Sequence, residues 1–408
     1  MSALNSIDAR PVVKLPTAIV LDGNQRAALA TVRSLGRRRV PVIVAESNAA
    51  SLAGASRYCG KQLVYPDPAS FPEPFMDWLE SLGRQYEGAV LLPMTDLTVP
   101  LVLQSAARFP ALRVGLPTLA AYEAVSDKFA LYDTAVALGV RVPQTAIITH
   151  EDVDSLRQRE LHFPLAVKPR LSTLRVAAGV AKRPVRYAAD VDELVSIARE
   201  ELAGGVADLL LQQYIEGYGA GVFGLYDKGK PLFFFAHRRL RERPPSGGVS
   251  VLSQSIAPPA EALESSRRIL ESLQWHGVAM VEFKIDAAGY CWLIEINARF
   301  WGSLQLAVDS GADFPWFLYQ LVTGQVPSPP AQFLIGRRLR WWLGDLDNLY
   351  ARLRQKEHRG TALQSVKAMA VFAIPWLPRM RYEFLRCSDP GPAFTALRQY
   401  FRALGAKR

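Results

Sequence analysis

Apolar runs alternate with helix-like stretches along the first part of the chain. The apolar run Thr17–Asp22 precedes the helix-like segment QRAALATVRSLG, which begins at Gln25. The strand-like runs VPVIVAES and GAVLLPMTD follow, with further helical patterns after them. Strands that alternate with helices are typical of a parallel sheet flanked by helices. We therefore predict an α/β domain over 17–124, preceded by a short tail, 1–16.

The turn after the first apolar run is Asp22-Gly23-Asn24, which is not a GxGxxG sequence. We therefore predict a Rossmann-like domain that lacks the fingerprint of a dinucleotide site. The turn lies at the carboxyl end of a predicted strand, where open α/β sheets usually bind ligands. An Asx turn that caps the next helix explains the same residues equally well.

A second unit of mixed pattern spans 125–327. It holds the helix-like SDKFALYDTAVALG, the strand-like FPLAVKPR, a helix near Asp190–Ala203 and the strand-like DLLLQQYI. Two more apolar runs, GVFGLYD and PLFFFAHRR, precede a helix near Pro259–Leu273. The segment VPSPPAQ then breaks the pattern, so we predict a basic, aromatic C-terminal extension over 328–408.

A hairpin-like segment that begins at Gly277 carries the strongest chemical signal. Its apolar runs VAMVEFKI and YCWLIEIN flank the turn-like Asp286–Gly289, as in a β-hairpin. Alternation along paired strands predicts that Glu282, Glu295 and Asn297 meet on one face. Such a set of oxygen donors suits Mg²⁺. The solvated face of an ordinary hairpin is the competing interpretation.

Arg299 extends this polar row, because it follows Asn297 by two residues. A cation at that position would hold an anion beside the metal. The sequences E-F-K and L-I-E-I-N-A-R-F-W-G-S together resemble the metal-binding end of the ATP-grasp superfamily. More narrowly, they resemble its bacterial carboxylate–amine ligase-like (predicted carboligase) branch. That branch commonly has Pro where this chain has Ala298, a change that removes no ligand.

The resemblance implies a fold of the α/β and α+β class. A Rossmann-like parallel sheet would precede a two-subdomain ATP-grasp fold, with subdomains at about 125–210 and 211–327, and a C-terminal appendage would follow. Lys128 and Lys168 match the two phosphate-binding lysines of the superfamily. Taken singly, each lysine also fits an ordinary surface position, and their joint spacing before the carboxylate hairpin is what singles them out.

The resemblance also implies an adenine-binding linker between the subdomains. Its residues are Gln212, Gln213, Tyr214, Ile215 and Glu216, and backbone groups of Gln213 and Ile215 would pair with the adenine edge. Relatives often carry a ribose-binding glutamate where this chain has Gly219, and Glu216 is the candidate substitute. A plain edge strand with a turn explains the same stretch without a ligand.

Two further loops match parts of such a site. The segment Arg170–Tyr187 corresponds to the lid over the triphosphate, but it contains only Gly179 as a glycine and is instead rich in Ser172, Thr173, Arg175, Lys182, Arg183 and Arg186. The segment AHRRLRERPPSGGVSVLSQ corresponds to the acceptor region. Its candidate substrate-binding residues are His237, Arg238, Arg239, Ser246, Gly247 and Gly248. A loop tip without a role is the alternative there.

The leading hypothesis is an ATP-dependent carboxylate–amine ligase. A carboxylate would be activated as an acyl phosphate and joined to an amine, or less favourably to a thiol or hydroxyl. Lys128 and Lys168 would balance the nucleotide charge, Glu282, Glu295 and Asn297 would hold two Mg²⁺ ions, and Arg299 would act with Lys168 in catalysis. The alternatives are a non-catalytic ATP sensor or adaptor, and a membrane-peripheral protein. The latter would act through the tryptophan- and arginine-rich stretches RRLRWW and AVFAIPWLPRMRY of the extension.

Composition narrows the setting. The chain has 408 residues, of which 50% are hydrophobic and 21% charged, as in a folded globular protein. A net charge of +10 suits an anionic small molecule such as ATP, and the sequence has no nucleic-acid-binding motif, so we expect no nucleic-acid partner. The three cysteines are far apart, and the N-terminus does not resemble a signal peptide, which together predict a cytoplasmic protein. A homodimer is the default expectation.

Overall fold

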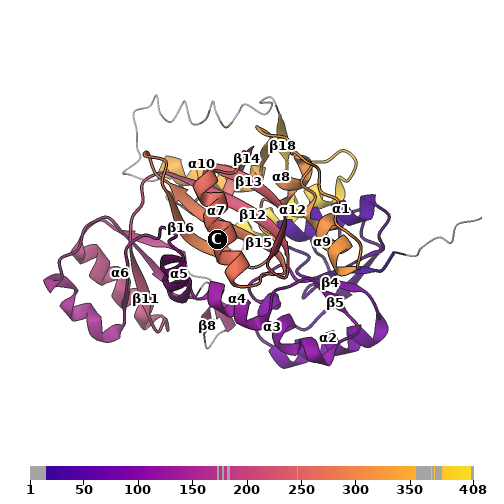
Figure 1. The fold of residues 1–408 in the computed structure, drawn as a ribbon, viewed down its shortest axis with the longest axis horizontal. Coiled ribbons are helices and arrows are strands. Elements are labelled where there is room, and N and C mark those ends of the chain that lie inside the picture. The colour runs from indigo at the N-terminus through magenta and orange to yellow at the C-terminus, as the bar shows by residue number, and fades with distance from the viewer. Residues whose placement is uncertain are drawn as a thin grey trace, which may run out of the picture.

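The computed structural model of the protein describes residues 15–171, 174–176, 179–181, 184–245, 247–354, 369, 372 and 379–405. Its larger sheets have five, four and seven strands. In Figure 1 the seven-stranded sheet lies at the centre, the N-terminal sheet at lower right and the four-stranded sheet at left. In the described part of the chain, no helix combines the length and the apolar character that a membrane span requires.

The N-terminal sheet is parallel, with strand order β3-β2-β1-β4-β5. Its strands are β1 (Ala18–Val20), β2 (Val42–Glu46), β3 (Lys61–Val64), β4 (Val90–Leu92) and β5 (Arg113–Val114). Its helices are α1 (Arg26–Arg37), α2 (Pro72–Gln85), α3 (Thr98–Ser105) and the 3₁₀ turn η1 (Ala106–Arg108). Apolar side chains on both faces of the central strands pack against helices, which is why these strands read as continuous apolar runs. The predicted α/β sheet is confirmed.

A four-stranded antiparallel sheet, β10-β7-β11-β6, forms the first half of the second unit. The helices α4 (Leu119–Ser126) and α5 (Lys128–Ala137) lead into it. Its other elements are β6 (Thr145–Ile148), η2 (His150–Gln158), β7 (Leu165–Pro169), the hairpin β8 (Leu174–Val176) with β9 (Gly179–Ala181), β10 (Arg186–Ala188), α6 (Val191–Ala203) and β11 (Leu209–Gln213). Its core packs α6 and η2 on one face of the sheet.

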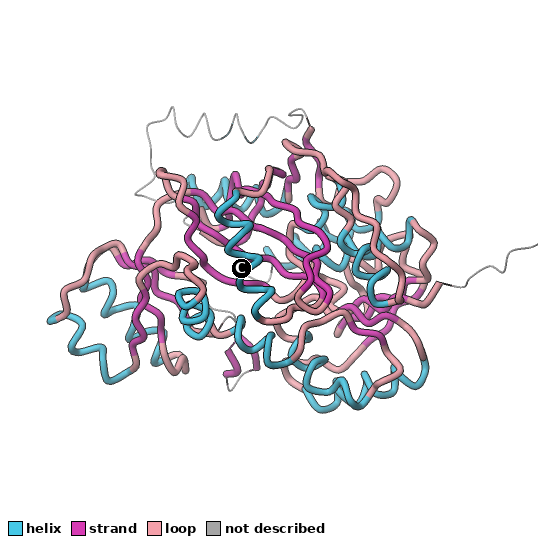
Figure 2. Tube along the Cα trace, in the orientation of Figure 1, coloured by secondary structure: helices cyan, strands magenta, loops and turns pink. Residues whose placement is uncertain are grey.

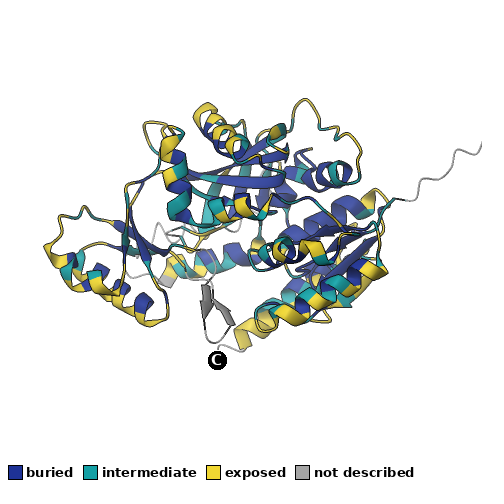
Figure 3. Cartoon of the chain, turned by 60° about the horizontal axis from the view of Figure 1, so that its bottom comes forward, coloured by how far each residue is buried: buried dark blue, intermediate teal, exposed yellow. Residues whose placement is uncertain are grey.

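The seven-stranded sheet has the order β16-β15-β12-β13-β14-β17-β18. Its strands are β12 (Tyr218–Asp227), β13 (Lys230–Arg243), β14 (Val249–Ile256), β15 (Gly277–Ile285), β16 (Cys291–Asn297), β17 (Arg338–Arg340) and β18 (Met380–Tyr382). The helix α7 (Ala260–Ser272) covers one face together with α4 and α5. The helices α8 (Leu304–Asp309) and α9 (Phe314–Val322) cover the other face, where they share a core with α1 of the N-terminal domain. Figures 2 and 3 show these strands enclosed by helices whose outer surfaces are exposed.

The extension after residue 327 is built into this architecture. Its strands β17 and β18 extend the large sheet, and α10 (Trp342–Arg354) and α12 (Gly391–Gly405) complete it. The fully buried Arg33 of α1 binds Asp389 Oδ2 through Nε at 2.7 Å and donates to the carbonyl of Glu383 at 2.7 Å. The end of the chain therefore packs against the first helix of the N-terminal domain.

Candidate active site

The hairpin β15–β16 brings Glu282 and Glu295 directly opposite each other in its register, beside a β-bulge. Asn297 Nδ2 donates to Glu282 Oε1 at 3.0 Å and to Glu295 Oε1 at 3.3 Å. The alternation of the strands therefore gathers all of the predicted metal ligands at one point.

The two carboxylates are half-buried in a strongly charged setting. Burial raises the pKa of Glu282, and the nearby Glu295 adds to that rise, while Arg239 opposes it. Arg239 forms an ion pair with Glu282, and its Nη1 lies 3.0 Å from Glu242 Oε1. Arg239, predicted as a substrate residue, is thus part of the carboxylate cluster.

Arg299 is fixed by a residue that the sequence interpretation missed. Its Nε and Nη2 donate to the two carboxylate oxygens of Asp96 at 2.7 and 2.8 Å, and Nη2 also donates to Asn297 Oδ1 at 2.9 Å. Asp96 raises the pKa of Arg299 against the effect of burial. Asp96 follows β4 at the carboxyl end of a parallel sheet, where such sheets usually bind ligands. This position in the sequence could have identified Asp96 as a candidate site residue.

Both predicted phosphate-binding lysines are buried beside the carboxylates. Lys128 is 6% exposed and Lys168 is 4% exposed. Burial lowers the pKa of both groups, that of Lys168 to about 8, while the charge of Glu295 raises both. A buried ammonium beside carboxylates keeps a strong attraction for an anion, because little water screens it.

Tyr132 connects the lysines to the rest of the site, and it too was missed. Its hydroxyl accepts hydrogen bonds from Lys168 Nζ and Gln212 Nε2, each at 3.0 Å, and donates to the carbonyl of Ile294 at 2.7 Å. The signal in the sequence is its spacing, since residues four apart on a helix share a face and Lys128 lies on the same helix.

The predicted adenine linker divides into buried and exposed parts. Gln212 turns its side chain inward, where Oε1 accepts from Lys168 Nζ at 2.8 Å and Nε2 donates to Thr145 Oγ1 at 2.9 Å. The backbone N–H of Gln213 donates to the carbonyl of Gln144 at 2.8 Å, so it is not available to an adenine.

The last residues of the linker follow β11. Ile215 is buried, whereas Tyr214 and Glu216 are exposed. The ring of Tyr214 meets that of Tyr187 edge to face, with centroids 5.5 Å apart. Adenine binding by this stretch remains a prediction.

The start of the predicted lid is tied to α5. Arg170 Nε donates to both oxygens of Asp127 at 2.8 and 2.7 Å, and Lys128 N donates to the carbonyl of Arg170 at 3.4 Å. Arg186 at the far end binds Glu200 at 2.6 Å. The remaining lid residues of interest, Ser172, Thr173, Arg175, Lys182 and Arg183, have side chains outside the described part of the structure.

The predicted acceptor residues do not all meet. His237 is fully buried against the ring of Phe223, its Nδ1 lies 3.1 Å from Ser303 Oγ, and burial holds its pKa well below the usual value. Arg238 faces the other side of the sheet and donates to Gln254. Arg238 is therefore turned away from the carboxylate cluster, because neighbours along a strand alternate. His237 shares the face of Glu282 through Gly221, but it is enclosed by the core.

The glycines of the acceptor loop have conformations that other residues rarely adopt. Gly247 and Gly248 have φ of 134° and 154°. A Cβ on Gly248 would lie 2.5 Å from the carbonyl oxygen of Arg243, and one on Gly247 would lie 2.7 Å from Tyr187 Oη. Their small size thus keeps the loop close to the tyrosine pair, while Ser246 lies outside the described residues.

The donor set fits Mg²⁺ in chemistry. Glu282 and Glu295 supply carboxylate oxygens, the donors that Mg²⁺ prefers. Asn297 turns its nitrogen toward them, so it would contribute its amide oxygen only after rotation of the side-chain amide. Within the described residues, no group of at least three His, Cys, Asp or Glu side chains is arranged to hold a metal.

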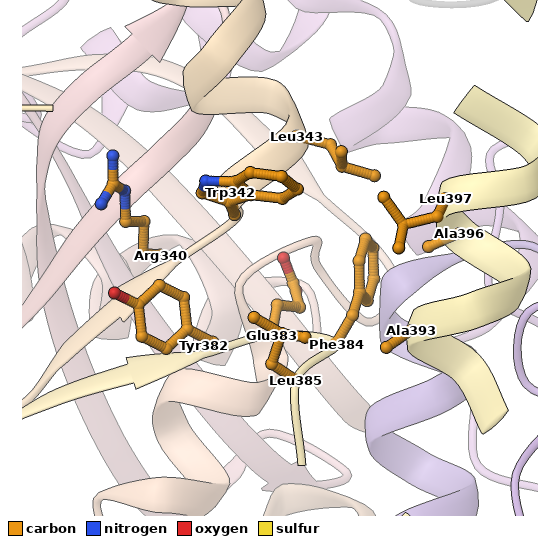
Figure 4. Close-up of a pocket in the computed structure, with 10 residues that line it drawn as sticks. All are labelled: Arg340, Trp342, Leu343, Tyr382, Glu383, Phe384, Leu385, Ala393, Ala396 and Leu397. Atoms are coloured by element: carbon orange, nitrogen blue, oxygen red, sulfur yellow. The ribbon is translucent and has the colours of Figure 1, made fainter. Parts of the chain in front are cut away.

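A small cavity lies elsewhere, between β17, α10, β18 and α12 (Figure 4). Its volume is about 30 Å³, which is room for about one or two water molecules. Its lining includes Trp342, Phe384 and Leu397 and none of the predicted site residues. It is too small for a nucleotide, and its position separates it from the carboxylate cluster.

The chain is similar in sequence and in fold to several known proteins. Residues 206–342 match a family model described as ATP-grasp in the biosynthetic pathway with Ter operon. No curated protein matches the sequence. The solved structure of L-amino acid ligase from Bacillus licheniformis is similar, with a TM-score of 0.60 and 15% identity over 76% of this chain and 74% of that one.

Two other solved structures have the same architecture. N5-carboxyaminoimidazole synthetase from Staphylococcus aureus, complexed with ADP, gives a TM-score of 0.60 and 15% identity over 80% of this chain and 82% of that one. The biotin carboxylase domain of Hydrogenobacter thermophilus 2-oxoglutarate carboxylase, in complex with MgADP, ADP and bicarbonate, gives 0.61 and 16% over 79% and 73%. These likenesses confirm the predicted fold. Within that fold, residues 206–342 are similar to the ATP-grasp family model.

Proposed function

We propose that the protein is an ATP- and Mg²⁺-dependent ligase that activates a carboxylate as an acyl phosphate and joins it to an amine. The observation that carries this proposal is that the buried Lys168 lies beside the half-buried Glu282 and Glu295. Similarity in fold to an L-amino acid ligase adds support.

The buried lysines suit the charge of a nucleotide. Phosphoryl transfer depends on positioning and charge neutralisation more than on covalent help from the protein. Lys128 and Lys168 supply positive charge from below the surface, where the low dielectric strengthens its attraction for the α- and β-phosphates. Tyr132 and Gln212 hold the ammonium of Lys168 in place through hydrogen bonds of 3.0 and 2.8 Å.

Glu282, Glu295 and Asn297 would hold Mg²⁺, which when bound neutralises charge on the β- and γ-phosphates. Arg299, held by Asp96, stabilises the negative charge of the transferring phosphoryl group. An oxygen of the substrate carboxylate attacks the γ-phosphorus, and ADP leaves. The amine then attacks the acyl carbon, phosphate leaves, and the nitrogen loses a proton.

Part of the predicted acceptor set enters this proposal. Arg239 lies in the carboxylate cluster, and its Nη1 also donates to the carbonyl of Gly248 at 3.2 Å. This bond ties the acceptor loop to the cluster. Arg239, Gly247 and Gly248 therefore line the acceptor side of the proposed site, whereas His237 lies buried in the core beside Ser303.

Glu295→Gln tests the proposal. The change removes a charge from the cluster while it keeps the size of the side chain, so we expect ADP release to fall to background with mixtures of carboxylic acids and amines. Glu264→Gln on the exposed surface of α7 is the matched control and should leave turnover unchanged. Undiminished ADP release by Glu295→Gln would contradict the assignment.

Calorimetry with Mg²⁺ and a non-hydrolysable ATP analogue separates binding from chemistry. A ligase binds the analogue and also turns over ATP with an acid and an amine. A wild-type protein that binds the analogue but releases no phosphate with any mixture would instead be a nucleotide sensor.

A further inference from the structure

A group of arginines lies on the face of the seven-stranded sheet opposite the candidate site. Arg238 of β13, Gln254 of β14 and Arg338 of β17 are neighbours in the strand register, so they share one face of the sheet. Arg239, next to Arg238 on the strand, points to the other face and pairs with Glu282. We call Arg238, Arg338 and Arg379 the arginine cluster.

Gln254 lies at the centre of the arginine cluster. Its Oε1 accepts hydrogen bonds from Nε and Nη2 of Arg238 at 3.0 and 2.8 Å. Arg379 Nη1 and Gln254 Nε2 lie 3.0 and 3.9 Å from the point where a Cβ on Gly336 would stand. The backbone of Arg338 donates to the carbonyl of Arg379 at 3.0 Å. Arg238 therefore contacts Gln254, Arg379 reaches the same side of Gly336, and Arg338 is the register neighbour of Gln254 on that face.

The next row of residues on the same face contains two arginines that are neutralised by a carboxylate. Arg241 and Arg340 are aligned across Leu252, and both bind Asp345 Oδ2, at 3.0 and 2.6 Å. Asp345 is fully buried between them. This row therefore carries its own counter-ion.

The arginine cluster has no such counter-ion within the described residues, because none of their carboxylates forms an ion pair with it. In the same described part, Arg338 Nε is buried without a hydrogen-bond partner. Arg238 and Arg379 are exposed and Arg338 is half-buried, so a ligand has access from solvent. Like charges held together repel one another, and a bound anion would relieve that repulsion.

The chemistry of the cluster selects the class of anion. Guanidinium groups match phosphate and carboxylate oxygens in paired hydrogen bonds. A carboxylate offers two oxygens, whereas a phosphate group offers three with a charge of about −1.5 to −2. We propose that the arginine cluster binds a phosphate group, either of a free anion or of a lipid headgroup. The neighbouring Leu334 and Ile335, 54% and 55% exposed, give a lipid an apolar contact.

Calorimetric titration of the full chain with inorganic phosphate tests the free anion. Loss of a charge-assisted contact weakens binding by about tenfold, so Arg238→Gln/Arg338→Gln should bind about a hundredfold more weakly. Arg381→Gln is the matched control, because this exposed arginine of β18 aligns with Leu339 and not with Arg338. Lys168→Met removes a lysine of the candidate active site and should leave the phosphate affinity of the cluster intact.

Sedimentation with vesicles that contain phosphatidic acid, whose headgroup is a phosphate monoester, tests the lipid headgroup, with phosphatidylcholine vesicles as the comparison of zero net charge. Binding in either experiment that is lost in the double variant and kept in Arg381→Gln supports the proposal. Absence of wild-type binding in both experiments, or binding that survives the double variant, overturns it. If the double variant melts at a lower temperature than the wild type, the single variant Arg379→Gln takes its place in both binding experiments.

Discussion

Asp96 holds Arg299 through both of its carboxylate oxygens, at 2.7 Å from Nε and 2.8 Å from Nη2. Asp96 follows β4 of the N-terminal sheet, and Arg299 follows β16 of the seven-stranded sheet. This ion pair joins the two domains at the carboxylate cluster, because Nη2 also bonds Asn297. The orientation of Arg299 therefore depends on the N-terminal domain.

We expect Asp96→Asn to lower kcat by about 10- to 100-fold, because partners that orient a functional group commonly have effects of that size. The binding of Mg²⁺ and an ATP analogue should change less. Steady-state ADP release and calorimetry give the two values. Asp77→Asn, which removes an exposed partner of Arg108, is the control, and an unchanged kcat in Asp96→Asn would contradict the role given to Arg299.

Tyr132→Phe removes one hydroxyl that links three elements. Lys168 and Gln212 lose an acceptor, and the carbonyl of Ile294 loses its donor. Lys168 Nζ and Gln212 Nε2 keep Gln212 Oε1 and Thr145 Oγ1 as partners, so the lost donor to Ile294 should lower the free energy of unfolding by about 1–3 kcal/mol. The looser hold on Lys168 should raise the KM for ATP. Urea unfolding and kinetics measure both, and Tyr86→Phe, whose hydroxyl bonds the exposed Lys61, should change neither.

The depressed pKa of Lys168 predicts a loss of ATP affinity on the alkaline side. Below the value of about 8 the ammonium is charged and attracts phosphate, and above it the neutral amine does not. The plot of kcat/KM for ATP against pH should therefore fall as pH rises through about 8. An arginine at this position keeps its charge at higher pH, so in Lys168→Arg the decrease in kcat/KM should occur at a higher pH. An identical profile in that variant would assign the titration to another group.

Asp389→Ala tests whether the extension is needed for stability. Arg33 and Asp389 are each 1% exposed in their side chains, and removal of one partner from a buried pair costs about 3–5 kcal/mol. Urea unfolding should show a loss of that size. Asp154→Ala breaks a pair with Arg199 in which the aspartate is 91% exposed and should cost less than about 1 kcal/mol.

The sequence was sufficient for those parts of the site that depend on local periodicity. The strand period of two predicts that Glu282, Glu295 and Asn297 share a face, and the hydrogen bonds between them agree. The alternation of strands and helices likewise predicts the parallel N-terminal sheet. Arg238 and Arg239 could have been separated by the same alternation, but the resemblance grouped them as one motif.

The parts that the sequence did not reveal depend on contacts between distant residues. Asp96 and Arg299 are 203 positions apart, and Tyr132 and Ile294 are 162 apart. No local pattern relates such pairs, because only the packing of domains brings them together. The same holds for the short strands β17 and β18. In the structure β17 pairs with the distant β14, and β18 pairs with β17.

The ion pair between Arg33 and Asp389 spans 356 positions, and that span has a consequence for synthesis. A ribosome makes the first helix long before it makes the aspartate, so throughout translation the nascent N-terminal domain exposes a guanidinium that the finished protein conceals. Completion of that domain must wait until Asp389 has left the exit tunnel.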